Sequence, residues 1–298
     1  MFVIFSVLQL ISARFLESEK MVTVPEGYSI IKTSQLLEDE GLIHSALLAR
    51  IYMQYKNISP KSGTYFFKKP GDMFSVITRI SESDYGDVYA SITIPEGSTN
   101  KQLVSAVKRS KIVVDEKILF DLIKGKEGYL FPDTYSFLPD VTESDIIKKL
   151  EKTFLEKIKK AETKKTVEKT QNEIVIMASI LEKEAGNDLE QKQIISGILW
   201  KRIRIGMLLQ VDAPFLYERG KGSAQLTHTD LKKDSPYNTY IHKGLTPTPI
   251  GNPGYDSLYA AAHPIESDYL FYLHAGDGSI HYGKNYNEHL KNIRLYLK

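Results

Sequence analysis

The chain has 298 residues, and its 39 Lys and Arg nearly balance its 37 Asp and Glu, giving a formal net charge of +2. This balance argues against a dedicated nucleic-acid-binding protein, whose surface is usually strongly basic. The absence of cysteine excludes disulfides, Cys-ligated zinc, iron–sulfur clusters and thiol catalysis. With 42% hydrophobic and 26% charged residues, the chain is expected to fold, and its length suits two or three domains.

The first 16 residues form an apolar run, MFVIFSVLQLISARFL. This run is shorter than the roughly 20 residues that span a bilayer. It also lacks the basic start and the small-residue cleavage site of a signal peptide. Two interpretations stay open, the remnant of a membrane anchor and a buried N-terminal helix. The polar stretch at 17–20 separates the run from the next element and favours the anchor remnant.

A short repeat gives the coarse organisation. VTVPEG at 22–27 recurs as ITIPEG at 92–97, an offset of 70 residues. Each copy predicts a short strand ended by Pro and Gly, followed by a Ser or Thr that can cap a helix. After the first copy, the sequence predicts helices from Ser29 and Ser45 and then the strand GTYFF. Residues 22–68 therefore have the predicted order β-α-α-β.

Between this unit and the C-terminal part, the pattern alternates between helices and loops. A helix from Asp72 leads into the second copy of the repeat, and another helix is predicted near 101–109. EGYLFPDTY at 127–135 predicts an aromatic, turn-rich loop. From Ser144 to about Lys169 the chain is rich in Lys and Glu, which we interpret as an amphipathic helix that frays into a solvated linker rather than as a basic binding patch.

A C-terminal domain begins after this linker. Residues 173–181 are apolar on every face of the predicted helix, which indicates burial. The helix ends in Glu182-Lys183-Glu184 and stops at Gly186. Further along, the sequence predicts a helix capped by Asn187 or Asp188, loops from Gly206 onward, a strand at 269–274 and a closing helix from about Asn287.

Glu182 is the candidate general acid. Its place in the last turn of an apolar helix disfavours the ionised form of the carboxyl, which suits proton donation near neutral pH. Glu184 follows two residues later, about 200° around the helix, so the two carboxylates cannot face each other as a dyad. One of them is expected to be catalytic or buried and the other solvated. The competing interpretation is that both Glu residues are ordinary polar residues at the end of a helix, without a catalytic role.

A second group of polar residues suggests a sugar-binding site. Gln210 and Asp212 lie in the segment LQVD at 209–212, and Asn238 and Tyr240 lie in the segment YNTY at 237–240. Such side chains hydrogen-bond sugar hydroxyl and N-acetyl groups, and aromatic rings stack on apolar sugar faces. The alternative is loop-stabilising Asn and packed Tyr. Asn252, in a GNPG turn, is expected to be conformational rather than catalytic.

Other chemistries find little support in the sequence. The seven histidines include no H-E-x-x-H motif and no pair spaced i, i+4 on a predicted helix, so no metal is expected. Neither a Gly-rich phosphate loop nor a G-x-S-x-G nucleophile elbow occurs. No cofactor is therefore predicted.

Taken together, the motifs resemble the endolytic murein transglycosylase, or YceG-like, family. The resemblance covers the chain from about residue 22 to its C-terminus, and the motifs that carry it, in order, are VTVPEG, EGYLFPDTY, ASILEKEAG at 178–186, RIGMLLQVD at 204–212, SPYNTY at 235–240, GLTPTPIGNPG at 244–254 and AAHP at 261–264. The chain departs from the family pattern around Asp212, where Val211 and Ala213 flank it, and in the loop at 244–250.

The resemblance implies an α+β protein of the inner membrane, anchored by a single N-terminal span, with its catalytic part outside the cytoplasm. Its expected parts are an anchor remnant at 1–20, a LysM-like subdomain at 21–82, a second α/β subdomain with the helical linker at 83–170, and a mixed α+β catalytic domain at 171–298.

The resemblance also implies a reaction. Such enzymes cut the β-1,4 bond between N-acetylmuramic acid and N-acetylglucosamine inside nascent glycan strands, and leave a 1,6-anhydro end that limits strand elongation. The family's acid falls on Glu182, and the expected partners are glycan strands, the plasma membrane and cell-wall synthases, with no nucleic acid. A single Glu suffices because the C6 hydroxyl of the sugar attacks in place of water. A non-catalytic murein-binding scaffold and a metal-dependent amidase are the competing functions.

Overall fold

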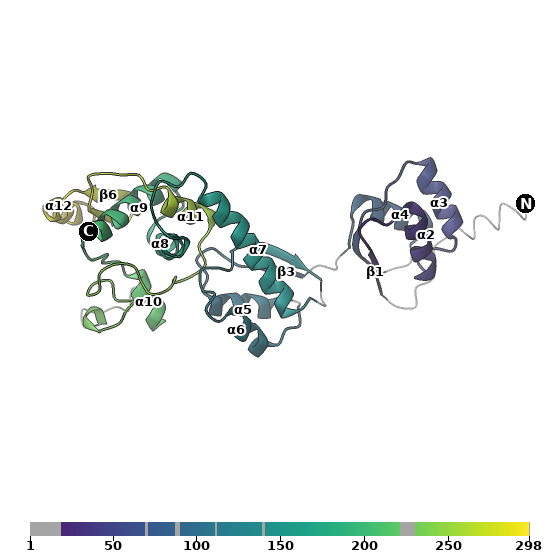
Figure 1. Ribbon diagram of the computed structural model, residues 1–298, viewed down its shortest axis with the longest axis horizontal. Helices are drawn as coiled ribbons and strands as arrows, with labels where there is room; N and C mark the ends of the chain where they lie inside the picture. The colour runs from purple at the N-terminus through teal and green to yellow at the C-terminus, as the bar shows by residue number, and fades with distance from the viewer. Residues whose placement is uncertain are drawn as a thin grey trace, which may run out of the picture. The chain divides into compact units, whose positions relative to one another are not determined.

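The computed structural model describes residues 19–68, 71–86, 90–110, 112–138, 141–220 and 230–297. The chain divides into two compact units, residues 1–90 with 136–139, and residues 91–135 with 140–298. Both units are drawn in Figure 1. The predicted anchor remnant at 1–16 lies outside the described residues. In the described ranges, no helix combines the length and the apolar character needed to cross a bilayer.

The first unit has the predicted β-α-α-β order, followed by one more helix. Its elements are β1 (Lys20–Val24), α2 (Ile30–Asp39), α3 (Ala46–Tyr55), β2 (Gly63–Phe67) and α4 (Met73–Glu82). Ser29, Ser45 and Asp72 cap the three helices, as the sequence predicts. The antiparallel strands place Val22 opposite Tyr65, and both side chains lie in the core that the helices cover.

Residues 90–161 form a two-stranded sheet and three helices. These elements are β3 (Ala90–Thr93), α5 (Asn100–Arg109), α6 (Glu116–Ile123), β4 (Thr134–Phe137) and α7 (Glu143–Ala161). The sequence analysis missed α6 because eight residues are too few for helical periodicity to stand out. The predicted loop at 127–135 is a turn that runs into β4.

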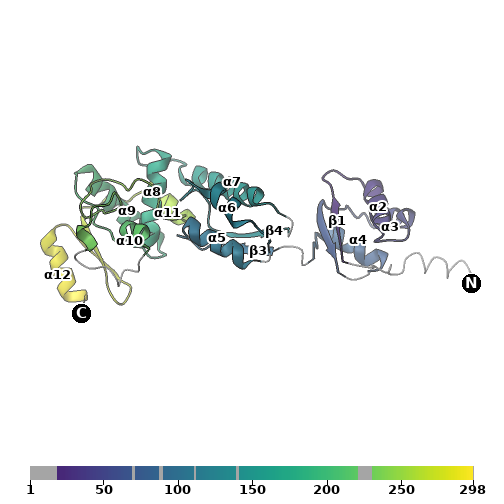
Figure 2. The same cartoon turned by 90° about the horizontal axis from the view of Figure 1, so that it is seen from below.

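Helix α8 (Gln171–Glu184) forms the centre of the second unit. Its residues 174–181 are all buried, which confirms the prediction from their all-round apolar pattern. A capping box joins Thr170 and Glu173 at its start. Helices α9 (Leu189–Arg204) and α11 (Tyr255–Ala262) pack against α8 and against each other, as the two views in Figures 1 and 2 show.

The expectation of continuous loops from Gly206 is wrong. The segment contains α10 (Ala213–Arg219) and α11, both of which are too short to give a periodic signal. The predicted strand at 269–274 is β5 (Phe271–His274), which pairs with an unpredicted strand, β6 (Ile280–Gly283). The closing helix is α12 (Tyr286–Tyr296), close to its predicted start. The mixed α+β class is confirmed.

Gly197 fixes how closely α9 approaches the chain after α11. A Cβ atom built on Gly197 would lie 2.0 Å from the carbonyl oxygen of Ile265, whose N–H donates to Gln193 at 3.0 Å. Only glycine therefore permits this backbone contact.

We expect Gly197→Ala to lower the free energy of unfolding by about 1–3 kcal/mol, because the added methyl group overpacks a backbone contact that cannot move freely. Gly276→Ala is the matched control, since a Cβ there meets nothing within 4 Å. Chemical denaturation of both variants measures the difference. Equal midpoints would contradict this account of the packing.

Candidate active site

Glu184 closes helix α8 and lies mostly inside the protein. Tyr272 Oη donates to its Oε2 at 3.1 Å, and the N–H of Ala213 donates to the same carboxylate. Burial raises the pKa of Glu184, and the nearby negative charge of Asp212 raises it further. The two hydrogen bonds and the positive charge of Arg202 act in the opposite direction. The result is a carboxyl that holds its proton to higher pH than usual.

Arg202 is the buried cation of this network. It comes from α9, and only 5% of its surface is exposed. Its Nε donates to the carbonyl of Leu270 at 2.7 Å, and its guanidinium lies 5.2 Å from the centre of the Phe271 ring. These contacts tie α9 to β5, so that Tyr272 on the same strand reaches Glu184.

The two predicted sugar-binding segments lie side by side next to Glu184. The N–H of Gln210 donates to the carbonyl of Thr239 at 3.1 Å, and Tyr240 Oη donates to Asp212 Oδ1 at 2.6 Å. Asp212 in turn acts on Glu184 through its charge. Gln210 has a left-handed backbone with φ of 52°, which is costly for a residue other than glycine, and its side chain is exposed.

Asn238 is placed differently from the other three predicted sugar contacts. It is fully buried, and its amide donates to the carbonyls of Leu231 and Lys233 at 2.9 and 2.8 Å. Its oxygen accepts from the N–H of Tyr240 at 3.0 Å. All these bonds hold the loop, so Asn238 supports Tyr240 from within the protein.

Asn252 is conformational, as predicted. It is fully buried, its Oδ1 accepts from the N–H of Leu130 at 3.0 Å, and its Nδ2 donates to the carbonyl of Ser98 at 2.9 Å and to Asn100 Oδ1 at 3.1 Å. One side chain thereby joins three segments far apart in the sequence.

Glu182 points to a different side of the helix end from Glu184. Its Oε2 accepts from the N–H of Gly254 at 2.9 Å, and its Oε1 lies 3.6 Å from Lys192 Nζ. The side chains of Glu182 and Lys192 are only 9% and 3% exposed, and Lys192 also donates to Ser257 Oγ at 3.0 Å. The expectation that one of the two Glu side chains is solvated is therefore wrong, because each is enclosed by its own set of partners.

The second copy of the repeat, ITIPEG at 92–97, packs next to the Glu182–Lys192 ion pair. A Cβ on Gly254 would lie 1.9 Å from Glu96 Oε1, so the Glu96 carboxylate rests directly over Gly254. Burial raises the pKa of Glu96, and the negative charge of Glu182 adds to this effect. A Cβ on Gly97 would lie 3.2 Å from Cγ of Glu182. The ITIPEG turn thus packs against the end of α8.

Two cavities meet at Glu184. The larger, of about 900 Å³, is lined by Lys101, Lys183 and Tyr217 among others, and the smaller, of about 470 Å³, by Gln210 and residues of β5 and α12. Glu184 and Asp212 line both cavities, whereas Glu182 lines neither. A ligand in either cavity could therefore reach the carboxyls of Glu184 and Asp212.

Sequence reasoning missed two residues of the larger cavity. Tyr217 Oη donates to Glu127 Oε2 at 3.1 Å, and the other oxygen of Glu127 accepts from the N–H of Asn100 at 2.9 Å. Burial raises the pKa of Glu127. The EGYLFPDTY motif begins with this Glu, but no local pattern indicates that its side chain lies against Tyr217 of α10.

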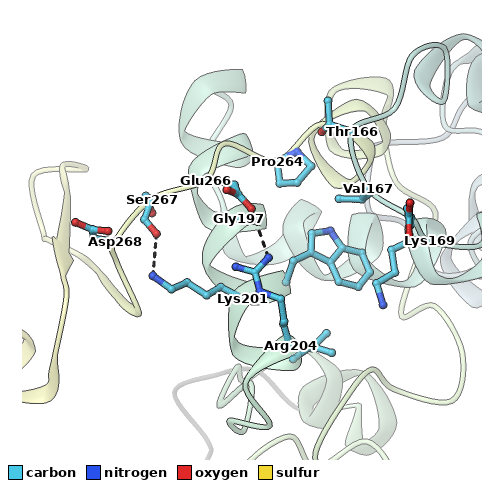
Figure 3. Close-up of a pocket in the computed structure, with 13 residues that line it drawn as sticks. Thr166, Val167, Lys169, Gly197, Lys201, Arg204, Pro264, Glu266, Ser267 and Asp268 are labelled. Atoms are coloured by element: carbon cyan, nitrogen blue, oxygen red, sulfur yellow. Dashed lines mark hydrogen bonds and ion pairs between the residues drawn. The ribbon is translucent and has the colours of Figure 1, made fainter.

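A third cavity, of about 810 Å³, lies on the side of α9 that faces residues 264–268 (Figure 3). There Lys201 donates to the carbonyl of Ser267 at 2.9 Å, and Arg204 lies 3.4 Å from Glu266. Neither Glu182 nor Glu184 lines this cavity. Across the part of the chain that the structure describes, no group of three or more His, Asp or Glu side chains could hold a metal ion.

Comparison with known proteins agrees with the motifs. Residues 22–295 match the YceG-like family. A Bacillus subtilis (strain 168) protein named endolytic murein transglycosylase is 32% identical over 307 aligned positions, which cover 93% of this chain and 84% of that protein. A Streptococcus pneumoniae (D39) protein of the same name is 28% identical over 94% of this chain and 59% of its own length.

A solved structure is also similar. The crystal structure of a YceG-like protein from Listeria monocytogenes superimposes with a TM-score of 0.55 at 29% identity, over 93% of this chain and 99% of that one. Fold and sequence together place the chain in one class of cell-wall protein. It belongs to the YceG-like family.

We expect Lys192→Met to lower the free energy of unfolding by about 3 kcal/mol, because it leaves the buried Glu182 carboxylate without its cation. Adding Glu182→Gln should recover part of this loss. Arg204→Ala is the control, since its ion pair with Glu266 is 64% and 85% exposed and should contribute less than about 1 kcal/mol. Thermal and urea unfolding measure all three, and equal losses for the buried and exposed pairs would refute the assignment.

Proposed function

We propose that this protein is an endolytic peptidoglycan lytic transglycosylase. It cleaves the β-1,4 bond between N-acetylmuramic acid and N-acetylglucosamine within glycan strands and forms 1,6-anhydro ends, which limits strand elongation. The observation that carries the proposal is a mostly buried carboxyl, Glu184, at the junction of two cavities beside Asp212. The names of the relatives from Bacillus and Streptococcus support the same reaction.

The geometry favours Glu184 as the general acid over Glu182, on which the family motif placed it. A general acid must carry a proton near the working pH and reach the leaving oxygen. Burial raises the pKa of Glu184 toward the working pH, and Glu184 lines both cavities. Glu182 is instead engaged by the N–H of Gly254 and by Lys192, and it lines neither cavity.

The reaction then needs one acid–base group and the sugar itself. Glu184 protonates the leaving glycosidic oxygen, and the same carboxylate afterwards accepts the proton of the attacking C6 hydroxyl. Because that hydroxyl belongs to the sugar, attack is intramolecular, and its effective concentration can exceed that of water by orders of magnitude. Asp212, held by Tyr240, stabilises the positive charge that develops at the anomeric carbon.

The remaining sequence-based expectations support this role. We propose that residues 1–20 anchor the protein in the cytoplasmic membrane with the catalytic part outside, where the glycan is. The β-α-α-β unit of β1, α2, α3 and β2 would bind murein as a LysM-like subdomain, and cell-wall synthases would supply the nascent strands. Gln210, Asp212 and Tyr240 would contact the sugars, with Asn238 as their support.

Mass spectrometry of uncrosslinked glycan strands tests the reaction and the acid together. The wild type should give internal fragments with 1,6-anhydromuramic ends, and Glu184→Gln should lower turnover by about 10²- to 10⁴-fold, because an amide of the same shape cannot donate the proton. Glu182→Gln should keep the product type with a smaller loss. If Glu182→Gln alone abolishes the products while remaining folded, Glu182 is the acid. Strands bound but left intact by the wild type would favour the non-catalytic scaffold, and reducing ends would mean hydrolysis.

Substitution of two neighbours of Glu184, Asp212 and Tyr272, should shift the alkaline limb of the pH profile of kcat/KM in opposite directions. Removing the negative charge with Asp212→Asn makes Glu184 lose its proton more easily, so the alkaline limb should move to lower pH. Tyr272→Phe removes a hydrogen bond that lowers the pKa of Glu184, so the alkaline limb should move to higher pH. Shifts of the same sign in both variants would contradict Glu184 as the acid.

A further inference from the structure

The smaller of the two cavities at Glu184, which we call the β5–α12 cavity, is a second candidate binding site next to the larger cavity. Its lining includes Gln210, Tyr286 and His289 as well as Phe271 from β5. All of these residues lie in the second unit, as do those of the larger cavity. Because the two cavities share Glu184 and Asp212, a polymer in one of them has a path to the other across the reacting carboxyl.

Tyr286 gives this cavity an aromatic surface for a ligand. It is 60% exposed although it opens helix α12, and its ring lies 6.0 Å from that of Phe271. The faces of Phe271 are occupied, with Arg202 at 5.2 Å and the His289 ring stacked at 5.1 Å. Phe271 therefore supports the wall, and Tyr286 offers the ring on which a sugar face can stack.

Gln210 gives the same cavity a polar group whose backbone is strained. Its φ of 52° costs a non-glycine residue on the order of 1 kcal/mol or more, and such strain often marks a functional position. Three backbone and side-chain bonds to Thr239 hold the segment in place: the N–H of Gln210 to the Thr239 carbonyl, the N–H of Val211 to Thr239 Oγ1, and Thr239 Oγ1 to the Val211 carbonyl. The fold thus presents an exposed amide, which suits sugar hydroxyl and acetamide groups.

Several charged side chains in the lining of the cavity are engaged within the protein. Arg202 is committed to the carbonyls of Leu270 and Leu209, and Asp212 to Tyr240. Burial and the charge of Arg202 lower the pKa of His289, so its ring is uncharged at neutral pH. The Gln210 side chain and the Tyr286 ring are exposed in the same lining.

We propose that the β5–α12 cavity is a sugar-binding subsite, so that a glycan strand occupies both cavities at once and is cut between them at Glu184. The inference rests on the proposed function and deepens it. An enzyme that cleaves within a strand must bind sugars on both sides of the broken bond, and the two cavities provide these two sides.

The test measures binding of a peptide-free octasaccharide of alternating N-acetylglucosamine and N-acetylmuramic acid to the full chain, by calorimetry. All proteins carry Glu184→Gln, so that the ligand stays intact. Tyr286→Ala and Gln210→Gly should each weaken binding about 5- to 10-fold, the loss expected for one aromatic or polar contact. Gln210→Gly should leave the melting temperature unchanged or higher, since glycine adopts this φ without strain.

Lys164→Gly is the matched control, because Lys164 has a φ of 55° and an exposed side chain and does not line either cavity. It receives the same backbone change and should bind the octasaccharide as the parent does. Binding by Tyr286→Ala and Gln210→Gly that equals this control would overturn the subsite while leaving the proposed function intact. If the parent fails to bind and the wild type fails to cleave, the proposed function falls and the subsite with it.

Discussion

The burial of residues 174–181 of helix α8 is the constraint on which the second unit depends. Residues 174–181 leave no polar face, so α9 and α11 must enclose the helix on several sides. Its last turn is the first place where polar side chains can emerge, and two Glu residues emerge there in different directions. One lies in an ion pair with α9, and the other lies at the junction of two cavities. A buried helix thus fixes the position of a carboxyl near the surface without needing a flexible loop.

The two copies of the PEG motif illustrate how context decides the role of a turn. A Cβ on Gly27 in the first copy would meet nothing within 4 Å. In the second copy, Gly97 is crowded by the side chains of Glu182 and Lys183, and Glu96 lies over Gly254. The sequence is nearly the same, and both glycines have positive φ. The first turn shapes a small subdomain, whereas the second packs against the candidate active site.

Local signals predicted much of the fold. Capping residues such as Ser29 and Asp188 located helix starts, and the all-apolar pattern located the buried core of α8. The short elements α6, α10, α11 and β6 escaped because seven or eight residues of a helix, or four of a strand, carry too little periodicity. Their stability comes from packing against distant segments.

The site was predictable in its residue types but not in its pairings. The sequence analysis grouped Gln210, Asp212 and Tyr240 by their chemistry, and all three line the smaller cavity in the structure. Sequence spacing separated the two Glu residues by direction but could not say which faced a cavity. That depends on Tyr272 and Arg202, which come from β5 and α9. Such partners are invisible to motif analysis because nothing local marks them.

The hydrogen bonds of Asn252 also bear on how the protein acquires its shape. They connect residues 98–100 and 130 to a position more than 120 residues later. Contacts of such sequence separation are slow to form, because a long loop must close before they stabilise anything. The hydrogen bond from the N–H of Gly97 in the ITIPEG turn to the carbonyl of Asn252 likewise requires residue 252 to be present. During synthesis, the junction of the two cavities would stay incomplete until the C-terminal segments that carry β5 and α12 have been made.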